Sequence, residues 1–189
     1  DVYKRQISLV MDTSNSYLAV GLYQDNVCLE AFQEKGSRRQ SEKAIPTLKE
    51  VLDRHHIALK DVNEMIITSG PGSYTGVRVA MTIAKTLAAV SDVRIKSVSS
   101  LAAYAGMNQA LSVIDARGHK VFVGVYENGL PLIKEQVVAL EDFAQLRAEY
   151  GDFELVGEIG CLGLDEKECD LCANIYALGQ MADPIENVD

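Results

Sequence analysis

One sequence pattern occurs twice in the chain, and this duplication constrains the fold more than any other feature. Residues 10–26, VMDTSNSYLAVGLYQDN, align without gaps on residues 113–129, VIDARGHKVFVGVYENG. Each copy has an apolar run that ends in aspartate, a short polar turn, an alternating run and a further apolar segment, which is typical of three consecutive strands. The aligned aspartates are Asp12 and Asp115. The repeat predicts two lobes built on one plan.

The segments after each copy extend this plan. Residues 41–56 carry apolar side chains at helical spacing, with Ser41 as the expected N-cap and Pro46 expected near the start of regular hydrogen bonding. The first copy continues with a strand at 64–69, a glycine-rich loop at 70–76 and a helix of roughly 75–91. The second repeats this order in shorter form, with a helix near 141–149, the strand FELVG and a last helix near 171–181. Each lobe is therefore expected to have the order β-β-β-α-β-α.

This order predicts the α/β class and, more narrowly, the actin-like, ribonuclease-H-like (ASKHA) fold, in which helices cover mixed sheets. We expect an N-terminal lobe at 1–108 and a smaller C-terminal lobe at 109–189. The chain begins without Met and ends on the polar run MADPIENVD, so we expect the C-terminal lobe to be truncated.

Charge and hydropathy restrict the partners. The formal net charge is -9 and the pI is near 4.8, so the long-range field has the wrong sign for a direct grip on nucleic acid. Binding to RNA would therefore need a partner. No run of the sequence approaches the ~18 to 20 apolar residues of a membrane span. A cytoplasmic location without membrane contact is expected.

The loop GPGSYTG at 70–76 has the composition of a phosphate-binding loop but not the spacing. Neither the G-x-x-x-x-G-K-[ST] pattern nor G-x-G-x-x-G is satisfied, because Thr75 stands where each needs glycine. Two interpretations stay open. Gly70, Gly72 and Ser73 could present N–H groups to an anion at the start of the next helix, or the glycines could allow a tight turn and close packing of helix on sheet.

The two strand-end aspartates also have two interpretations. Asp12 and Asp115, from facing lobes, could together hold a magnesium nucleotide, with Thr13 beside the first of them. The turn after Asp12 is TSNS, which suits this role better than ARGHK after Asp115, where there is a single glycine. Alternatively, both aspartates only cap their turns.

Motifs for catalysis are missing. The three histidines form no H-x-x-x-H or H-E-x-x-H pair, and there is no G-x-S-x-G nucleophile motif. One C-x-x-C, Cys169 to Cys172, lacks the second pair of ligands that a zinc site needs, so the four cysteines are expected to be free thiols.

Several stretches together resemble the TsaB (YeaZ) family. They are MDTSNSYLAVGL, QSEKAIPTLKEVL, TSGPGSYTGVRVAMTIAKTLA, KSVSSLAAYA and VIDARGHKVFVGVY. The resemblance covers about residues 7–130 and is most specific in GPGSYTGVR and the later DAR. Two features depart from the family: Gln40 stands where the family usually has His, and the family's C-terminal tail is missing.

The resemblance implies a function. Members of this family are similar to TsaD, the subunit that transfers a threonylcarbamoyl group to N6 of the tRNA adenosine next to the anticodon, but are catalytically silent. Ser100 and Tyr104 stand where TsaD has two metal-binding histidines, and hydroxyls cannot replace imidazoles as ligands of a transition metal. No metal is therefore expected.

We thus expect a non-catalytic dimerisation subunit that works with TsaD and the ATPase TsaE, and that meets tRNA only through the complex. It could form a homodimer when alone. No cofactor is expected on this chain by itself, while binding of ATP or ADP in the complex is left open. The alternatives are an active actin-fold enzyme, either a kinase or a glycoprotease-like metalloenzyme, and a homodimeric binding module unrelated to tRNA.

The expected partner surface lies on two helices of the N-terminal lobe. The helix after the glycine loop has one bulky apolar side, suited to its own sheet, formed by Val79, Ile83, Leu87 and Val90. The other apolar side has small residues that would let another helix approach closely. With Leu48 of the preceding helix, the expected partner-binding residues are Val77, Ala80, Met81, Ala84 and Ala88. Alternatively, this alanine side packs on that helix within the chain.

Overall fold

A computed structural model describes residues 5–36 and 40–186. Its first sheet has the order β3-β2-β1-β4-β5, in which β1, β4 and β5 are parallel and β2 and β3 are antiparallel to their neighbours. The strands are β1 (Ile7–Asp12), β2 (Tyr17–Gln24), β3 (Val27–Lys35), β4 (Glu64–Thr68) and β5 (Arg94–Val98). The mixed sheet confirms the expected class.

The second sheet is built on the second copy of the repeat. Its order is β10-β6-β7-β8, and β9 pairs with β7. The strands are β6 (Ala110–Arg117), β7 (Lys120–Glu127), β8 (Leu130–Pro131), β9 (Gln136–Ala139) and β10 (Glu154–Gly157). As β4 does with β1, β10 pairs with β6 in parallel, so the two sheets share one core arrangement.

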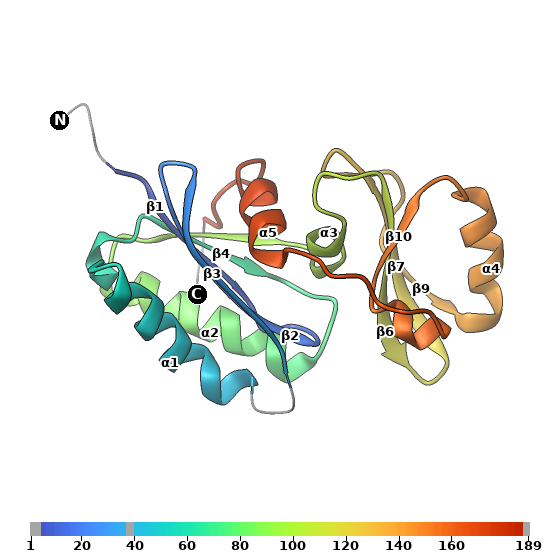
Figure 1. The fold of residues 1–189 in the computed structure, drawn as a ribbon, viewed down its shortest axis with the longest axis horizontal. Coiled ribbons are helices and arrows are strands. Elements are labelled where there is room, and N and C mark those ends of the chain that lie inside the picture. Colours follow the sequence, from blue (N-terminus) through green and yellow to red (C-terminus); the bar gives the residue numbers. More distant parts are fainter. Residues whose placement is uncertain (1–4, 37–39, 187–189) are drawn as a thin grey trace.

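Helices cover both sheets (Figure 1). They are α1 (Gln40–Arg54), α2 (Tyr74–Val90), α3 (Ser100–Ala105), α4 (Leu140–Glu149) and α5 (Leu171–Gly179), with short 3-10 turns η1 (Leu59–Asp61) and η2 (Ile159–Leu162). Helices α1 and α2 lie on one face of the first sheet, and α5 lies on the other (Figure 1). The short pair β5 and α3 was not part of the expected repeat.

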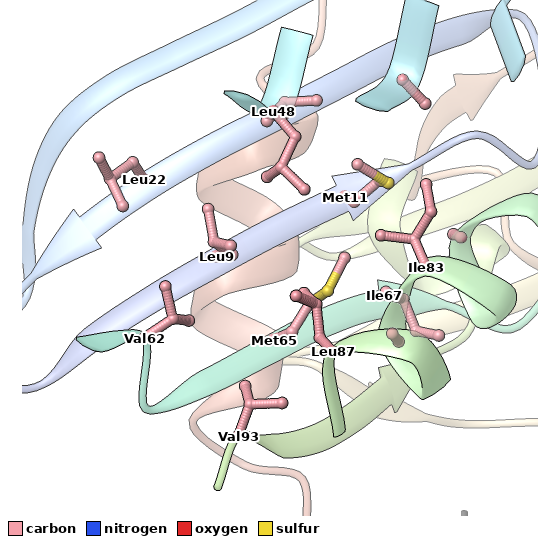
Figure 2. Close-up of a cluster of buried hydrophobic side chains, with 14 of the residues drawn as sticks. Leu9, Met11, Leu22, Leu48, Val62, Met65, Ile67, Ile83, Leu87 and Val93 are labelled. Carbon is pink, nitrogen blue, oxygen red and sulfur yellow. The ribbon is translucent and has the colours of Figure 1, made fainter. Parts of the chain in front are cut away.

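The core follows these layers. Strand β1 is buried throughout: Leu9 and Met11 face α1 and α2, while Val10 joins the cluster on the other face. Figure 2 shows the first cluster, in which Leu48 and Ile83 from the two helices meet side chains of the strands. Burial on both faces is typical of parallel strands, and it explains the continuous apolar sequence ISLVMD.

Two expectations about helices need correction. Helix α1 begins at Gln40, so Pro46 lies beyond its first turn. Because proline has no N–H group, the helix lacks one backbone hydrogen bond at this residue. The last helix, expected in the C-terminal lobe 109–189, contacts β1, β2, β4 and β5 of the first sheet instead. Leu171 and Ile175 of α5 are fully buried, because the second face of that sheet would otherwise expose its apolar residues.

Candidate functional site

The first aspartate is buried in a network of hydroxyl groups. Asp12 ends β1 and is 2% exposed. Its Oδ1 accepts hydrogen bonds from Thr68 Oγ1 (2.7 Å), Ser14 N (2.8 Å) and Ser14 Oγ (2.6 Å). The chain itself thus supplies three donors to this oxygen and buries the carboxylate almost completely.

The glycine-rich loop packs directly on the turn after Asp12. Ser73 N donates to Ser14 O (2.8 Å), and Thr13 Oγ1 donates to Gly76 O (2.5 Å). A Cβ atom on Gly72 would lie 2.3 Å from Ser14 O, and one on Gly76 would lie 2.1 Å from Thr13 O. Only glycine fits at either place.

The loop geometry favours packing over phosphate binding. Carbonyl oxygens of the turn occupy the space in front of the loop, and these acceptors would repel an anion. At the start of α2, Ser73 Oγ accepts from Gly76 N (3.2 Å) and so caps the helix. Gly70, with φ of +95°, donates its N–H to Ser100 Oγ (3.1 Å). The close packing of helix and turn therefore accounts for Gly72 and Gly76, and the positive φ accounts for Gly70.

The second aspartate lies in a different environment. Asp115 is exposed, and its Oδ1 accepts from Arg117 N (2.8 Å), the bond of a turn cap. Gly118 follows at φ +61° with no atom within 4 Å of where a Cβ would stand. Within residues 5–36 and 40–186, no hydrogen bond joins Asp115 to Asp12, so the two aspartates form no shared cluster there.

A glutamate that sequence reasoning missed connects the two turns. Glu158 follows β10, and its Oε1 accepts from Asp115 N (3.0 Å), while its Oε2 accepts from Ser16 Oγ of the turn after β1. Burial raises the pKa of the Glu158 carboxyl above its usual value. No local pattern could have identified it, because Ser16 is 142 residues away in sequence.

The residues in place of the metal histidines are buried. Ser100 Oγ lies 2.9 Å from Ser14 Oγ, and Tyr104 is 5% exposed, with a hydroxyl that forms no hydrogen bond in the described part of the chain. Burial, with the carboxylates of Glu158 and Asp12 nearby, raises the pKa of Tyr104. Within residues 5–36 and 40–186, no group of three or more His, Cys, Asp or Glu side chains is arranged so that it could hold a metal ion.

The cysteines are free thiols, as expected. Cys172 is fully buried, and burial raises its pKa to about 12. Burial also raises the pKa of Cys161 and of Cys169, each to about 11. Such thiols remain protonated at neutral pH, which makes them poor nucleophiles.

The alanine side of α2 is mostly internal. Ala80 and Ala84 are fully buried, and Leu48 of α1 is 5% exposed, all in the chain's own core. For Ala80 and Ala84 the expected partner contact is wrong, because these small residues let α2 pack closely on α1 and the sheet. Leu48 packs in the same core but also lines the groove between the two helices. Three further residues of the expected set are half-buried: Val77, Met81 and Ala88. Met81 and Ala88 pack against the same core. Of the bulky side, Val90 is 73% exposed.

An apolar groove of about 430 Å³ lies between α1, η1 and α2. Its apolar lining includes Ile45, Leu48, Leu52, Ile57, Ile83 and Leu87. Ile45 is 60% exposed at its edge, and Thr82 and Thr86 are exposed on α2. An exposed apolar surface bordered by polar residues is typical of a protein interaction site.

In residues 5–36 and 40–186, no helix is long and apolar enough to cross a membrane.

Related sequences indicate the family to which the chain belongs. The model of the family TsaD, tRNA N6-adenosine threonylcarbamoyltransferase, matches residues 33–156. The tRNA threonylcarbamoyladenosine biosynthesis protein TsaB of Bacillus subtilis is 33% identical over 150 residues, which are 75% of this chain and 66% of that protein. TsaB of Escherichia coli is 31% identical over 132 residues, 65% of this chain and 57% of that protein. The chain thus spans less than two thirds of their length.

Solved structures show the same fold. YeaZ from Pseudomonas aeruginosa superposes with a TM-score of 0.82 at 23% identity, covering 97% of each chain. A protein with similarity to peptidase YeaZ from the same organism has a TM-score of 0.81 at 25% identity, covering 93% of this chain and 91% of its own. These matches confirm the actin-like fold. The matching family model, the related sequences and the shared fold lead to one conclusion: the chain belongs to the TsaB (YeaZ) family.

Proposed function

We propose that this chain is a non-catalytic subunit that pairs with TsaD, and works with TsaE, in the transfer of a threonylcarbamoyl group to N6 of the tRNA adenosine next to the anticodon. The observation that carries the proposal is the groove between α1 and α2, an apolar surface that the described residues leave open. Family membership supports the pathway, since the related TsaB proteins are named for threonylcarbamoyladenosine biosynthesis.

The site around Asp12 supports a silent subunit. Its carboxylate already accepts three hydrogen bonds from Thr68 and Ser14, and backbone oxygens of the turn lie against the glycine loop. We therefore propose that the chain alone binds no nucleotide, and that ATP or ADP is bound only in the complex. With a net charge of -9, the chain should bind tRNA alone no better than about 10 µM at physiological salt.

The partner surface can be tested with a charge at the edge of the groove. Ile45→Glu would place a carboxylate in the joint with TsaD, and an unpaired charge in an interface costs about 3 kcal/mol or more, so pairing should weaken about 100-fold or more. Val27→Glu is the matched control, because Val27 is equally exposed, at 60%, but lies on β3. Gel filtration and titration calorimetry with TsaD measure the effect. Normal pairing of the Ile45 variant would reject this surface.

Two further measurements complete the test. Ala84→Glu should unfold the free chain, since Ala84 is fully buried, whereas Ile45→Glu should leave the thermal unfolding midpoint nearly unchanged. Threonylcarbamoyl transfer to unmodified tRNA should stay at background with this chain alone and appear when TsaD and TsaE are added. Turnover by the chain alone that Asp12→Ala abolishes would overturn the silent role.

A further inference from the structure

A second cavity, of about 600 Å³, lies away from the α1–α2 groove, between the start of α3, the β7–β8 hairpin and the end of α5. Helix α5 lies on the other face of the first sheet from α1 and α2, and α3 packs on α5 and on the second sheet (Figure 1). Most of the lining is apolar, including Val98, Ala102, Leu130, Ile133, Leu178 and Met181. Leu130 and Met181 are 58% and 48% exposed, so the cavity opens to the surface.

One carboxylate lies in this apolar lining. Glu135 Oε1 accepts hydrogen bonds from Tyr126 OH and Ser99 Oγ, which fix the position of the side chain. In the described part of the chain, Glu135 Oε2 has no hydrogen bond or ion pair. The adjacent Lys134 lines the cavity as well, but no ion pair joins it to Glu135 among these residues. The Glu135 carboxylate is therefore fixed through Oε1, and its Oε2 is available to a ligand in the cavity.

We propose that this cavity binds a small organic cation, an ammonium group on an apolar body, with Glu135 as its counter-ion. A cavity of about 600 Å³ has the size of a small-molecule site, and such sites combine an apolar lining with a few fixed polar groups. An ammonium donates a charge-assisted hydrogen bond to a carboxylate, which is about twice as strong as a neutral one. A carboxylate ligand would be repelled, and the net charge of -9 also favours cations.

The test uses n-hexylammonium as the probe and methyl NMR of the whole chain as the readout. Saturable shifts should appear at the methyl groups of Met181, Leu130 and Ala102, with a dissociation constant on the order of 1 mM, as suits so small a ligand. The neutral 1-hexanol should bind at least tenfold more weakly, and hexanoate should cause no saturable shift. Equal binding of hexanol or hexanoate, or shifts confined to other methyl groups, would overturn the proposal.

A matched pair of variants tests the role of the charge. Glu135→Gln keeps an oxygen that accepts from Tyr126 and Ser99 but removes the charge, so hexylammonium should bind at least tenfold more weakly and hexanol should bind unchanged. Glu141→Gln makes the same change on exposed α4 and should have no effect. Unchanged hexylammonium binding by Glu135→Gln would overturn the proposal. So would stronger binding of acetyl-Ala-Leu-Lys-Ala-amide at the same methyl groups, which would identify a protein segment as the occupant.

Discussion

Asp12 and Asp115 hold matching positions in the two copies of the repeat, but only the first is buried. In the first copy the carboxylate accepts from Thr68 and Ser14, and the glycine loop packs over the turn. In the second copy the carboxylate caps its own turn and faces solvent, while the backbone N–H of Asp115 donates to Glu158. The same strand-end residue thus has two roles, set by what covers it.

The difference shows that a duplicated backbone does not preserve a site. The first turn is closed by a loop that needs glycine at 72 and 76, because other residues would meet backbone oxygens. In the second lobe the parallel strand β10 ends at Gly157 and Glu158 follows it, and within the described residues Asp115 remains exposed. The turn of the first copy is closely packed under a loop, and the turn of the second copy faces solvent.

The largest expected difference between the two turns is the loss of stability when a glycine in each is replaced by alanine. Gly76→Ala should destabilise the fold by about 3 kcal/mol, because its Cβ would lie 2.1 Å from Thr13 O, a backbone atom that cannot rotate away. Gly118→Ala should destabilise the fold by only about 1 kcal/mol, because no atom lies near the new Cβ and the cost comes from the positive φ alone. Urea unfolding of both variants measures this. Equal losses would show that the glycine loop does not pack as described.

A smaller difference is expected for the aspartates themselves. Asp12→Asn should cost about 2 kcal/mol, because it weakens charge-assisted bonds and leaves a buried amide N–H without a partner. Asp115→Asn keeps the oxygen that accepts from Arg117 N and should change stability by less than about 0.5 kcal/mol. The same unfolding experiment applies. A larger loss at Asp115 would reverse the assignment of the buried site.

The smallest effect concerns pH. Burial raises the pKa of Glu158, so between the usual value of 4.5 and the folded-state pKa the folded chain binds more protons than the unfolded chain. This group's contribution to stability therefore falls as pH rises through that window. Glu158→Gln should remove that part of the pH dependence, whereas Glu149→Gln on the exposed side of α4 should retain it. Parallel pH profiles for wild type and Glu158→Gln would contradict the raised pKa.

The sequence predicts the elements of both lobes well where periodicity is strong. The helix expected at 75–91 is found at Tyr74–Val90, and the strand expected at 64–69 is Glu64–Thr68. Periodicity shows which side chains share a face of a helix, but not which segment packs against that face. The small side chains of Ala80 and Ala84 fit a partner helix or the chain's own core equally well by pattern, and the structure places them in the core.

The candidate site is predictable only in part. The spacing of GPGSYTG fails both standard phosphate-loop patterns but leaves anion binding and tight packing open, and the packing of the loop on Thr13 and Ser14 favours the second. The contact of Glu158 with Ser16 joins residues far apart in sequence, and nothing near Glu158 marks it. The position of α5 could not be predicted either. Its contacts with the first sheet join residues far apart in sequence and depend on the path of the chain between β5 and α5.

The return of α5 to the first sheet has a consequence for the order of folding. During synthesis, residues 1–108 emerge with one face of their sheet uncovered by α5, including Val10, Ala19 and Ile66. These residues become part of a closed core only after Leu171–Gly179 has been made and has crossed back. Such long-range contacts form late and slow the completion of the fold. The two lobes are therefore copies in sequence but not independent folding units, and the first is completed by a helix that follows the second.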